Sequence, residues 1–195
     1  MGQIETDNIN INLLWTGGWD STFQLLRLLL IYKVRVTPFY IIDESRSSTL
    51  MEIKAISMIK NHLITEYPHV KELMKATQYH AVTNISHNKN ISDSYRSLQK
   101  KVRVGIQYEW LARFCFEKDI QNMQLSVEDI IIPSPTDFFS NYITPFLKLE
   151  KIGNQEVYLL DPKIKSTDQY KVFKYFSFPI IKLTKLQSIE IVNKK

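Results

Sequence analysis

Two adjacent glycines between an apolar run and an amphipathic run constrain the fold of this chain most strongly. Residues 9–15 are mainly apolar, residues 16–22 read Thr-Gly-Gly-Trp-Asp-Ser-Thr, and residues 23–32 are amphipathic. This order predicts a strand, a glycine turn and a helix. Glycine adopts backbone conformations that other residues avoid and lets a ligand approach the main chain. The N–H groups of such a turn, together with those of the following helix, form a concave site for phosphate oxygens.

The side chains of the same segment add polar groups to this site. Ser21 and Thr22 carry hydroxyl groups that donate hydrogen bonds to phosphate, and Asp20 would hold Mg²⁺ or orient the loop. The segment therefore predicts a pyrophosphate cradle. Its expected ligand contacts are Thr16, Gly17, Gly18, Trp19, Asp20, Ser21 and Thr22. The alternative is an ordinary strand–turn–helix connection, in which the glycines serve only steric needs.

This segment resembles the S-G-G-x-D-S signature of the PP-loop ATP pyrophosphatases, the adenine nucleotide alpha hydrolase superfamily, with Thr16 in place of the first serine. Residues 178–185 are similar to the P-L-x-x-x-[ST]-K segment of that family, most closely in its 7-cyano-7-deazaguanine synthases. The resemblance implies a Rossmann-like, doubly wound parallel sheet with ATP over the carboxyl ends of the strands. It also implies a chemistry. Members cleave ATP to AMP and pyrophosphate, transfer AMP to a carbonyl or carboxylate oxygen, and let a nitrogen or sulfur nucleophile displace it.

The resemblance further implies roles for individual residues. Asp20, Ser21 and Lys185 become the expected catalytic residues, and Lys185 would neutralise charge on the leaving pyrophosphate. Asp43 and Arg46 follow the second expected strand, where this superfamily contacts the nucleotide. Asp43 would bind the ribose or a metal ion, and a turn-forming or helix-capping role is the alternative.

Two further segments offer candidate ligands. Gly105 with Gln107 would line a nucleotide or substrate pocket, or would simply begin a helix. Glu128 and Asp129 follow the fourth expected strand, where they would bind Mg²⁺ or substrate, or lie in a solvated loop. We expect Asp20 and Asp129 to be the magnesium ligands.

Expected strands and helices alternate along the chain. After the first strand and helix, the pattern predicts strands at 34–42, 79–83, 124–127 and 156–160, helices at 48–64 and 106–116, a loop at 84–93, and an amphipathic helix after residue 185. The expected inner positions of the helices at 48–64 and 106–116 are Met51, Ala55, Met58, Ile59 and Leu63, and Ile106, Trp110, Leu111 and Phe114. Such alternation predicts a doubly wound α/β domain that binds ligands at the topological switch point. We expect one domain over residues 1–195.

Composition narrows the classes of partner and location. The net charge of +5 and a pI near 9.1 favour anionic partners. A solvated lysine-rich surface is nonetheless preferred to a nucleic-acid site, because the sequence has no arginine-rich arm and no aromatic–basic repeat. The four histidines lack the spacing of a helical metal site and Cys115 is a lone cysteine, so we expect no zinc. The apolar run 25–32 is too short to span a bilayer, and residues 1–8 lack a secretory signal, which favours the cytoplasm.

Three functional hypotheses follow. The first is an adenylating enzyme that uses ATP and Mg²⁺ on an unknown small-molecule acceptor, with a homodimer suggested by the family. The second is a catalytically inactive nucleotide-binding subunit. It is motivated by the missing zinc cysteine cluster of the deazaguanine synthases and by a chain that stops ten residues after Lys185, so that a C-terminal portion is lacking or a partner supplies it. The third is a tRNA-modifying PP-loop enzyme, for which Cys115 is a poor catalytic cysteine.

Overall fold

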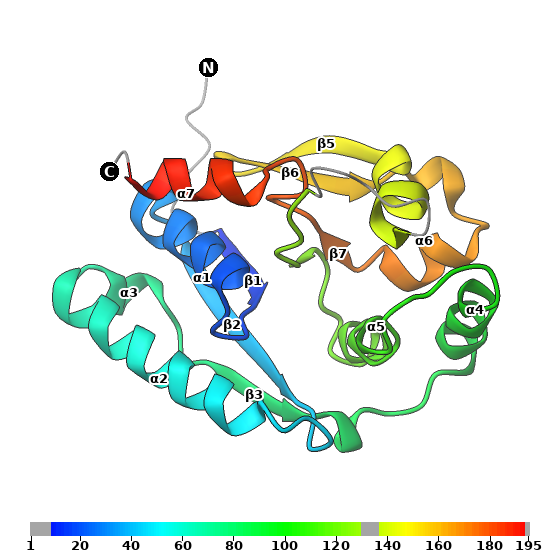
Figure 1. The fold of residues 1–195 in the computed structure, drawn as a ribbon, viewed down its shortest axis with the longest axis horizontal. Coiled ribbons are helices and arrows are strands. Elements are labelled where there is room, and N and C mark those ends of the chain that lie inside the picture. Colours follow the sequence, from blue (N-terminus) through cyan, green and yellow to red (C-terminus); the bar gives the residue numbers. More distant parts are fainter. Residues whose placement is uncertain (1–8, 130–136, 194–195) are drawn as a thin grey trace.

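A five-stranded parallel sheet forms the centre of the molecule (Figure 1). The structure is a computed structural model that describes residues 9–129 and 137–193. The strand order is β3-β2-β1-β4-β7, and each neighbouring pair is parallel. The strands are β1 (Asn10–Leu14), β2 (Arg35–Ile42), β3 (Gln78–Ala81), β4 (Met123–Gln124) and β7 (Phe176–Ser177). The chain is thus a mixed α/β protein whose sheet is compatible with the expected Rossmann-like fold.

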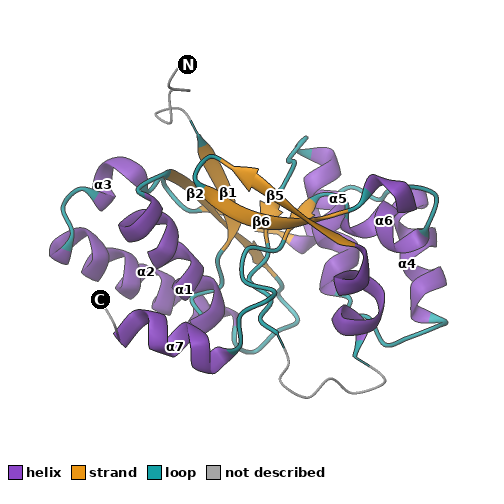
Figure 2. Cartoon of the chain, turned by 90° about the horizontal axis from the view of Figure 1, so that it is seen from above, coloured by secondary structure: helices purple, strands orange, loops and turns teal. Residues whose placement is uncertain are grey.

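Helices cover both faces of the sheet (Figures 1 and 2). One face carries α1 (Trp19–Leu26), its π-helical continuation (Arg27–Tyr32), α2 (Thr49–Glu66) and α3 (Val70–Leu73). The other carries α4 (Lys89–Gln99), α5 (Gln107–Glu117) and α6 (Asp168–Phe173). The last helix, α7 (Lys185–Asn193), lies beside α1. Short helical segments occupy Val82–Asn84, Phe139–Ile143, Thr144–Phe146 and Pro162–Ile164, and β5 (Leu147–Ile152) pairs with β6 (Gln155–Leu160) in an antiparallel hairpin.

Strand β2 shows why the sheet has a core on each face. Val36 and Tyr40 pack into the core under α1, α2 and α3, whereas Phe39 and Ile41 pack into the core under α4, α5 and α6. Successive side chains of a strand point to opposite faces, so a parallel strand covered on both sides needs a nearly continuous apolar sequence. The expected strand at 34–42 is confirmed on this ground.

Several expectations about the elements are wrong. Helix α4 begins at Lys89, inside the segment expected to be a loop, because the Asn88 side chain accepts a hydrogen bond from the Ile91 N–H group and caps the helix. The sequence does not predict strands β5 and β7. The strand expected at 156–160 is confirmed as β6, and it pairs with β5 rather than joining the parallel sheet.

The buried faces of the helices also differ from the expected ones. In α2, Leu63 is buried as expected, but Met51 and Met58 are exposed, and Ile56, which was not among the expected inner positions, is buried. In the expected helix at 106–116, Ile106 is exposed although Trp110, Leu111 and Phe114 are buried. The apolar positions of α7 are exposed as well, namely Leu186, Ile189 and Val192. In each case the backbone position relative to the sheet, rather than the apolar period, decides which face is covered.

Two features of the described residues bear on the chemical class of the chain. Cys115 is fully buried, and this burial raises the pKa of its thiol to about 12. The thiol therefore packs as an apolar group, as expected.

No helix in residues 9–129 or 137–193 is both long enough and apolar enough to cross a membrane.

A chain of three buried glutamines joins α1 to the sheet and to the hairpin. Gln24 Nε2 donates to Gln124 Oε1 at 2.7 Å, and Gln124 Nε2 donates to Gln155 Oε1 at 2.7 Å. All three side chains are almost completely buried. Buried amides stabilise a fold only when they are paired, so this chain fixes α1 against β4 and β6.

We predict that Gln124→Leu lowers the free energy of unfolding by about 2–4 kcal/mol, because it leaves the Gln24 amide and the Gln155 carbonyl buried without partners. Gln121→Leu is the matched control, since Gln121 is exposed and lies just before β4. Its effect should stay within about 0.5 kcal/mol. Chemical denaturation measures both variants, and equal losses in the two would contradict a structural role for the glutamine chain.

Candidate functional site

The glycine turn between β1 and α1 presents unpaired N–H groups. Gly17 has a φ of +72°, and Gly18 is the N-cap of α1 with a φ of −75° and no side-chain cap. Among the described residues, nothing accepts a hydrogen bond from the main-chain N–H groups of residues 17–21. Unpaired N–H groups at a helix start attract anions, because the helix dipole is positive there. The turn therefore has the donor arrangement expected of a phosphate cradle.

Thr16 and Ser21 brace this turn internally. The Thr16 N–H group donates to Ser21 Oγ at 3.2 Å, and the two hydroxyl oxygens lie 3.3 Å apart. Ser21 Oγ also donates to the Gly18 carbonyl at 3.3 Å. Ser21 is largely buried, so its hydroxyl holds the shape of the turn in this state.

Gly17 brings the turn against α2. A Cβ atom at Gly17 would lie 3.2 Å from the Glu52 carbonyl oxygen and 3.3 Å from both Ala55 Cβ and Ile56 Cγ1. A Cβ atom at Gly18 would meet only Thr16 Oγ1, at 3.5 Å. The first glycine is thus required by backbone conformation and close packing, whereas the second faces open space.

A cavity of about 660 Å³ lies beside the turn, at the carboxyl ends of β1, β2 and β4. The chain passes from β1 to β2 on one side of the sheet and returns to place β4 on the other side of β1, so the switch point lies between β1 and β4. The cavity has the volume of a typical small-molecule site. Its polar wall includes residues of the turn and of the loop after β2, and its apolar wall includes Leu14, Ile41, Trp110, Leu111 and Leu125.

Charged side chains from the ends of three neighbouring strands meet at the turn. Lys185 Nζ, after β7, lies 3.7 Å from Asp20 Oδ1, after β1. The two groups form an ion pair, because this distance is too long for a hydrogen bond. Glu128, after β4, faces the same pair. Asp20 Oδ1 and Glu128 Oε1 are both buried and have no hydrogen-bond partner.

The Glu128 carboxyl is electrostatically perturbed by this arrangement. Burial raises its pKa above the ordinary value of 4.5, and the Asp20 carboxylate adds to the effect. Ser188 and Lys185 act in the opposite direction. Burial, more than the neighbouring Asp20 carboxylate, therefore disfavours the charged form of Glu128.

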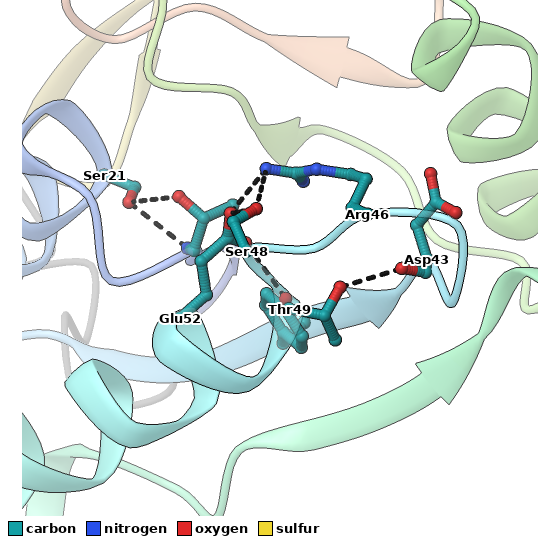
Figure 3. Close-up of polar contacts among 8 residues, drawn as sticks. Ser21, Asp43, Arg46, Ser48, Thr49 and Glu52 are labelled. Carbon is teal, nitrogen blue, oxygen red and sulfur yellow. Dashed lines mark hydrogen bonds and ion pairs between the residues drawn. The ribbon is translucent and has the colours of Figure 1, made fainter.

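The loop after β2 forms a second, hydrogen-bonded wall of the cavity (Figure 3). Arg46 reaches to Glu52 and Ser48 at the start of α2. The Tyr40 hydroxyl donates to the other Glu52 oxygen at 2.9 Å, and burial together with Glu52 raises the pKa of Tyr40 to about 12. Glu52 therefore holds Arg46 at the cavity.

Asp43 takes part in a turn in this structure. Its Oδ1 accepts hydrogen bonds from the Ser45 N–H group at 3.0 Å and the Ser45 hydroxyl at 2.6 Å. Its carbonyl accepts a hydrogen bond from the Thr49 hydroxyl at 2.7 Å. One carboxylate oxygen of Asp43 therefore has the turn-forming role that was the alternative to ligand binding. Asp43 also lines the cavity.

Most of the residues expected at the site come together. The cavity is lined by Thr16, Gly18, Trp19, Asp20, Ser21, Asp43 and Arg46, and also by Gln107. Gly17 lies in the same turn, and Lys185 contacts Asp20.

Three expected residues lie elsewhere. The Thr22 hydroxyl accepts a hydrogen bond from Trp15 Nε1 at 3.1 Å, and Thr22 lines a different, apolar cavity. Gly105 does not line the site cavity, and a Cβ atom there would collide with the Gln107 side chain. Asp129 is exposed, and its N–H group donates to the Leu183 carbonyl at 2.8 Å. Of the two adjacent acids, Glu128 is the one that faces Asp20.

Sequence reasoning missed Tyr40 and Ser126. Both line the cavity, and the Ser126 hydroxyl is buried without a partner. Ser126 lies two residues beyond β4, and its position after a strand beside the switch point is the signal that identifies it. Tyr40 gives no such signal, because an aromatic residue within an apolar strand is typical of a core.

Comparison of this chain with known protein families, with curated proteins and with solved structures finds no match. The function is therefore inferred from the geometry of the site and from its chemistry.

We predict that Gly17→Ala lowers the free energy of unfolding by about 1–2 kcal/mol, because alanine is strained at a positive φ and would press on α2. Gly18→Ala should stay within about 1 kcal/mol of the unmodified chain, since its φ suits alanine and its surroundings are open. Thermal and chemical denaturation of the two variants measure the difference. A larger loss in Gly18→Ala than in Gly17→Ala would contradict this description of the turn.

The raised pKa of Glu128 predicts a pH dependence of stability. The folded state holds the Glu128 proton more tightly than the unfolded state does, so this residue lowers the free energy of unfolding as the pH rises from 4.5 through the raised pKa. Glu128→Gln should lack this loss. Its stability relative to the unmodified chain should therefore increase over that pH window, measured by denaturation without divalent cations. A constant difference across the window would show that the Glu128 pKa is not raised.

Proposed function

We propose that this protein is an ATP-dependent adenylating enzyme with the fold and chemistry of the PP-loop ATP pyrophosphatases. The observation that carries the proposal is the run of unpaired N–H groups at residues 17–21, next to Lys185 and open to the cavity at the switch point. Such a turn offers fixed donors where the charge of a polyphosphate would lie. The resemblance of residues 16–22 to the S-G-G-x-D-S signature supports the same ligand.

The cavity has a polar wall and an apolar wall, and this arrangement suits a nucleotide. The β and γ phosphates lie on the turn, with Lys185 neutralising part of their charge. The base lies toward the apolar wall of Ile41, Trp110 and Leu125, which can contact a flat ring on its faces. Arg46, which is held by Glu52, lines the same cavity and would contact the nucleotide.

The two carboxylates fit a magnesium ion. Asp20 Oδ1 and Glu128 Oε1 are buried oxygen atoms without hydrogen-bond partners, and Mg²⁺ binds in nucleotide sites through one or two carboxylates together with phosphate oxygens. Asp20 and Glu128 would therefore hold the ion, which supplies positive charge to the phosphates when bound. Asp129 as a ligand stays a prediction from the sequence.

The chain's own groups act by binding and by neutralising charge. An oxygen of the small-molecule acceptor attacks the α phosphorus, the bond from that phosphorus to the bridging oxygen breaks, and pyrophosphate leaves with the electron pair. A nitrogen or sulfur nucleophile then attacks the carbon of the adenylated acceptor, and AMP leaves with the electron pair of the bond that breaks. The turn and Lys185 stabilise the charge that develops on the leaving group. No side-chain nucleophile is needed, which agrees with the burial of Cys115. This chemistry uses ATP and so fits the cytoplasmic location that the sequence favours.

We predict that Lys185→Ala lowers the rate of AMP formation about a hundred-fold or more, because it removes a charge that acts on the leaving pyrophosphate. The assay incubates protein, Mg²⁺ and ATP labelled on the α phosphate with the low-molecular-mass fraction of a cell extract as a source of acceptor. Lys75→Ala is the control with the same charge change. Its main-chain N–H group donates to the Val36 carbonyl near the start of β2. Lys75 therefore lies at the amino ends of the strands, whereas the glycine turn lies at their carboxyl ends.

Three outcomes of that assay separate the hypotheses. Labelled AMP that depends on Lys185 and not on Lys75 supports the adenylating enzyme. Labelled ADP contradicts cleavage between the α and β phosphates. ATP that binds tightly but yields no AMP supports the catalytically inactive subunit.

A further inference from the structure

A second polar cavity lies away from the glycine turn, between the end of the first helix, the β5–β6 hairpin and the segment after β7. Its volume is about 320 Å³, and it shares no lining residue with the cavity at the turn. Three of its lining residues carry positive charge, namely Arg27, Lys151 and Lys182, and Glu156 is the acid among them. The cavity therefore has an excess of positive charge.

Arg27 is held in place by neutral groups. Its NH1 donates to Gln24 Oε1 at 3.0 Å and to the Pro179 carbonyl at 3.4 Å, and its NH2 donates to the Tyr32 hydroxyl at 2.8 Å. The guanidinium also lies over the rings of Phe23 and Tyr32, with 5.7 and 5.5 Å to their centroids. No acid in the described part of the chain forms an ion pair with this half-buried cation.

An arginine fixed in this way is prepared to bind an anion. A partly buried charge costs free energy unless it is paired, and here hydrogen bonds and aromatic rings orient the charge without neutralising it. Because the side chain is already ordered, an incoming anion does not have to order it. The guanidinium geometry suits the paired oxygens of phosphate and carboxylate.

The two lysines add uncompensated charge to the same cavity. Lys151 and Lys182 are exposed, and neither forms an ion pair with a described residue. Glu156 lies opposite Lys151 in the hairpin register, but no ion pair joins them. Tyr32 and Tyr158 also line the cavity, and their hydroxyl groups are hydrogen-bond donors.

We propose that this cavity binds a phosphate group, as free phosphate or as the phosphomonoester of a small molecule. Three cations against one acid favour a doubly charged ligand over a single carboxylate. The volume lies at the lower end of small-molecule sites, which suits a phosphate group rather than a whole nucleotide. This site is independent of the nucleotide site, and either can fail without the other.

The test measures binding of inorganic phosphate to Gly18→Ala protein, in which the added methyl group crowds the cradle at the glycine turn. Titration calorimetry at constant ionic strength gives the dissociation constant. Adding Lys151→Ala and Lys182→Ala should weaken binding about ten-fold or more, because two charge-assisted contacts are lost. Adding Lys75→Ala and Lys100→Ala instead removes the same charge from exposed lysines outside the cavity, and should leave the affinity unchanged.

Each outcome decides the proposal. Loss of affinity confined to the Lys151 and Lys182 variant supports the site. Equal loss in both double variants would reduce the effect to net charge, and no loss in either would place phosphate elsewhere. Both results overturn the proposal. A parallel titration with glycerol phosphate distinguishes the two sources, since tighter binding of the ester than of free phosphate identifies a phosphomonoester ligand.

Discussion

The left-handed backbone at Gly17 is the constraint on which the arrangement of the site depends. It turns the chain from the end of β1 into α1 and brings the turn so close to α2 that a Cβ atom at Gly17 would lie 3.2 Å from the Glu52 carbonyl oxygen. Because a side chain would press on α2 there and the backbone is left-handed, glycine is the residue that allows this turn without strain. The turn leaves its N–H groups unpaired at the carboxyl edge of the sheet, and the cavity opens beside them.

The buried glutamine chain supports this edge from within. Gln24 lies one helical turn beyond Asp20 on α1, and Gln124 lies on β4 four residues before Glu128. Their hydrogen bond therefore fixes the two elements that carry the paired carboxylates. The Asp129 N–H bond to the Leu183 carbonyl holds the loop after β4 against the segment that leads to Lys185. The charged side chains that follow β1, β4 and β7 are thus brought together by hydrogen bonds between neutral groups.

The sequence predicted the features that local chemistry determines. The strand, glycine turn and helix around residues 9–32 and the apolar strand β2 follow from backbone conformation and from burial on both faces. Strand β4 overlaps the strand expected at 124–127 but is only two residues long, and the two-residue strand β7 is too short to give a period. The pairing of both depends on the rest of the sheet. Which of Glu128 and Asp129 faces Asp20, and that Thr22 pairs with Trp15, depends on the tertiary placement of loops. Sequence spacing does not contain that information.

The proposed function depends on ATP binding by the main chain of the glycine turn. The chain has only five glycines, at positions 2, 17, 18, 105 and 153. Glycine-selective ¹⁵N labelling therefore gives a simple amide spectrum, in which the Gly17→Ala and Gly18→Ala variants assign the turn. On titration with ATP and Mg²⁺, the Gly17 and Gly18 signals should shift, whereas Gly153, in the distant hairpin turn, should not. Unchanged Gly17 and Gly18 signals at saturating ATP would contradict ATP binding by this turn.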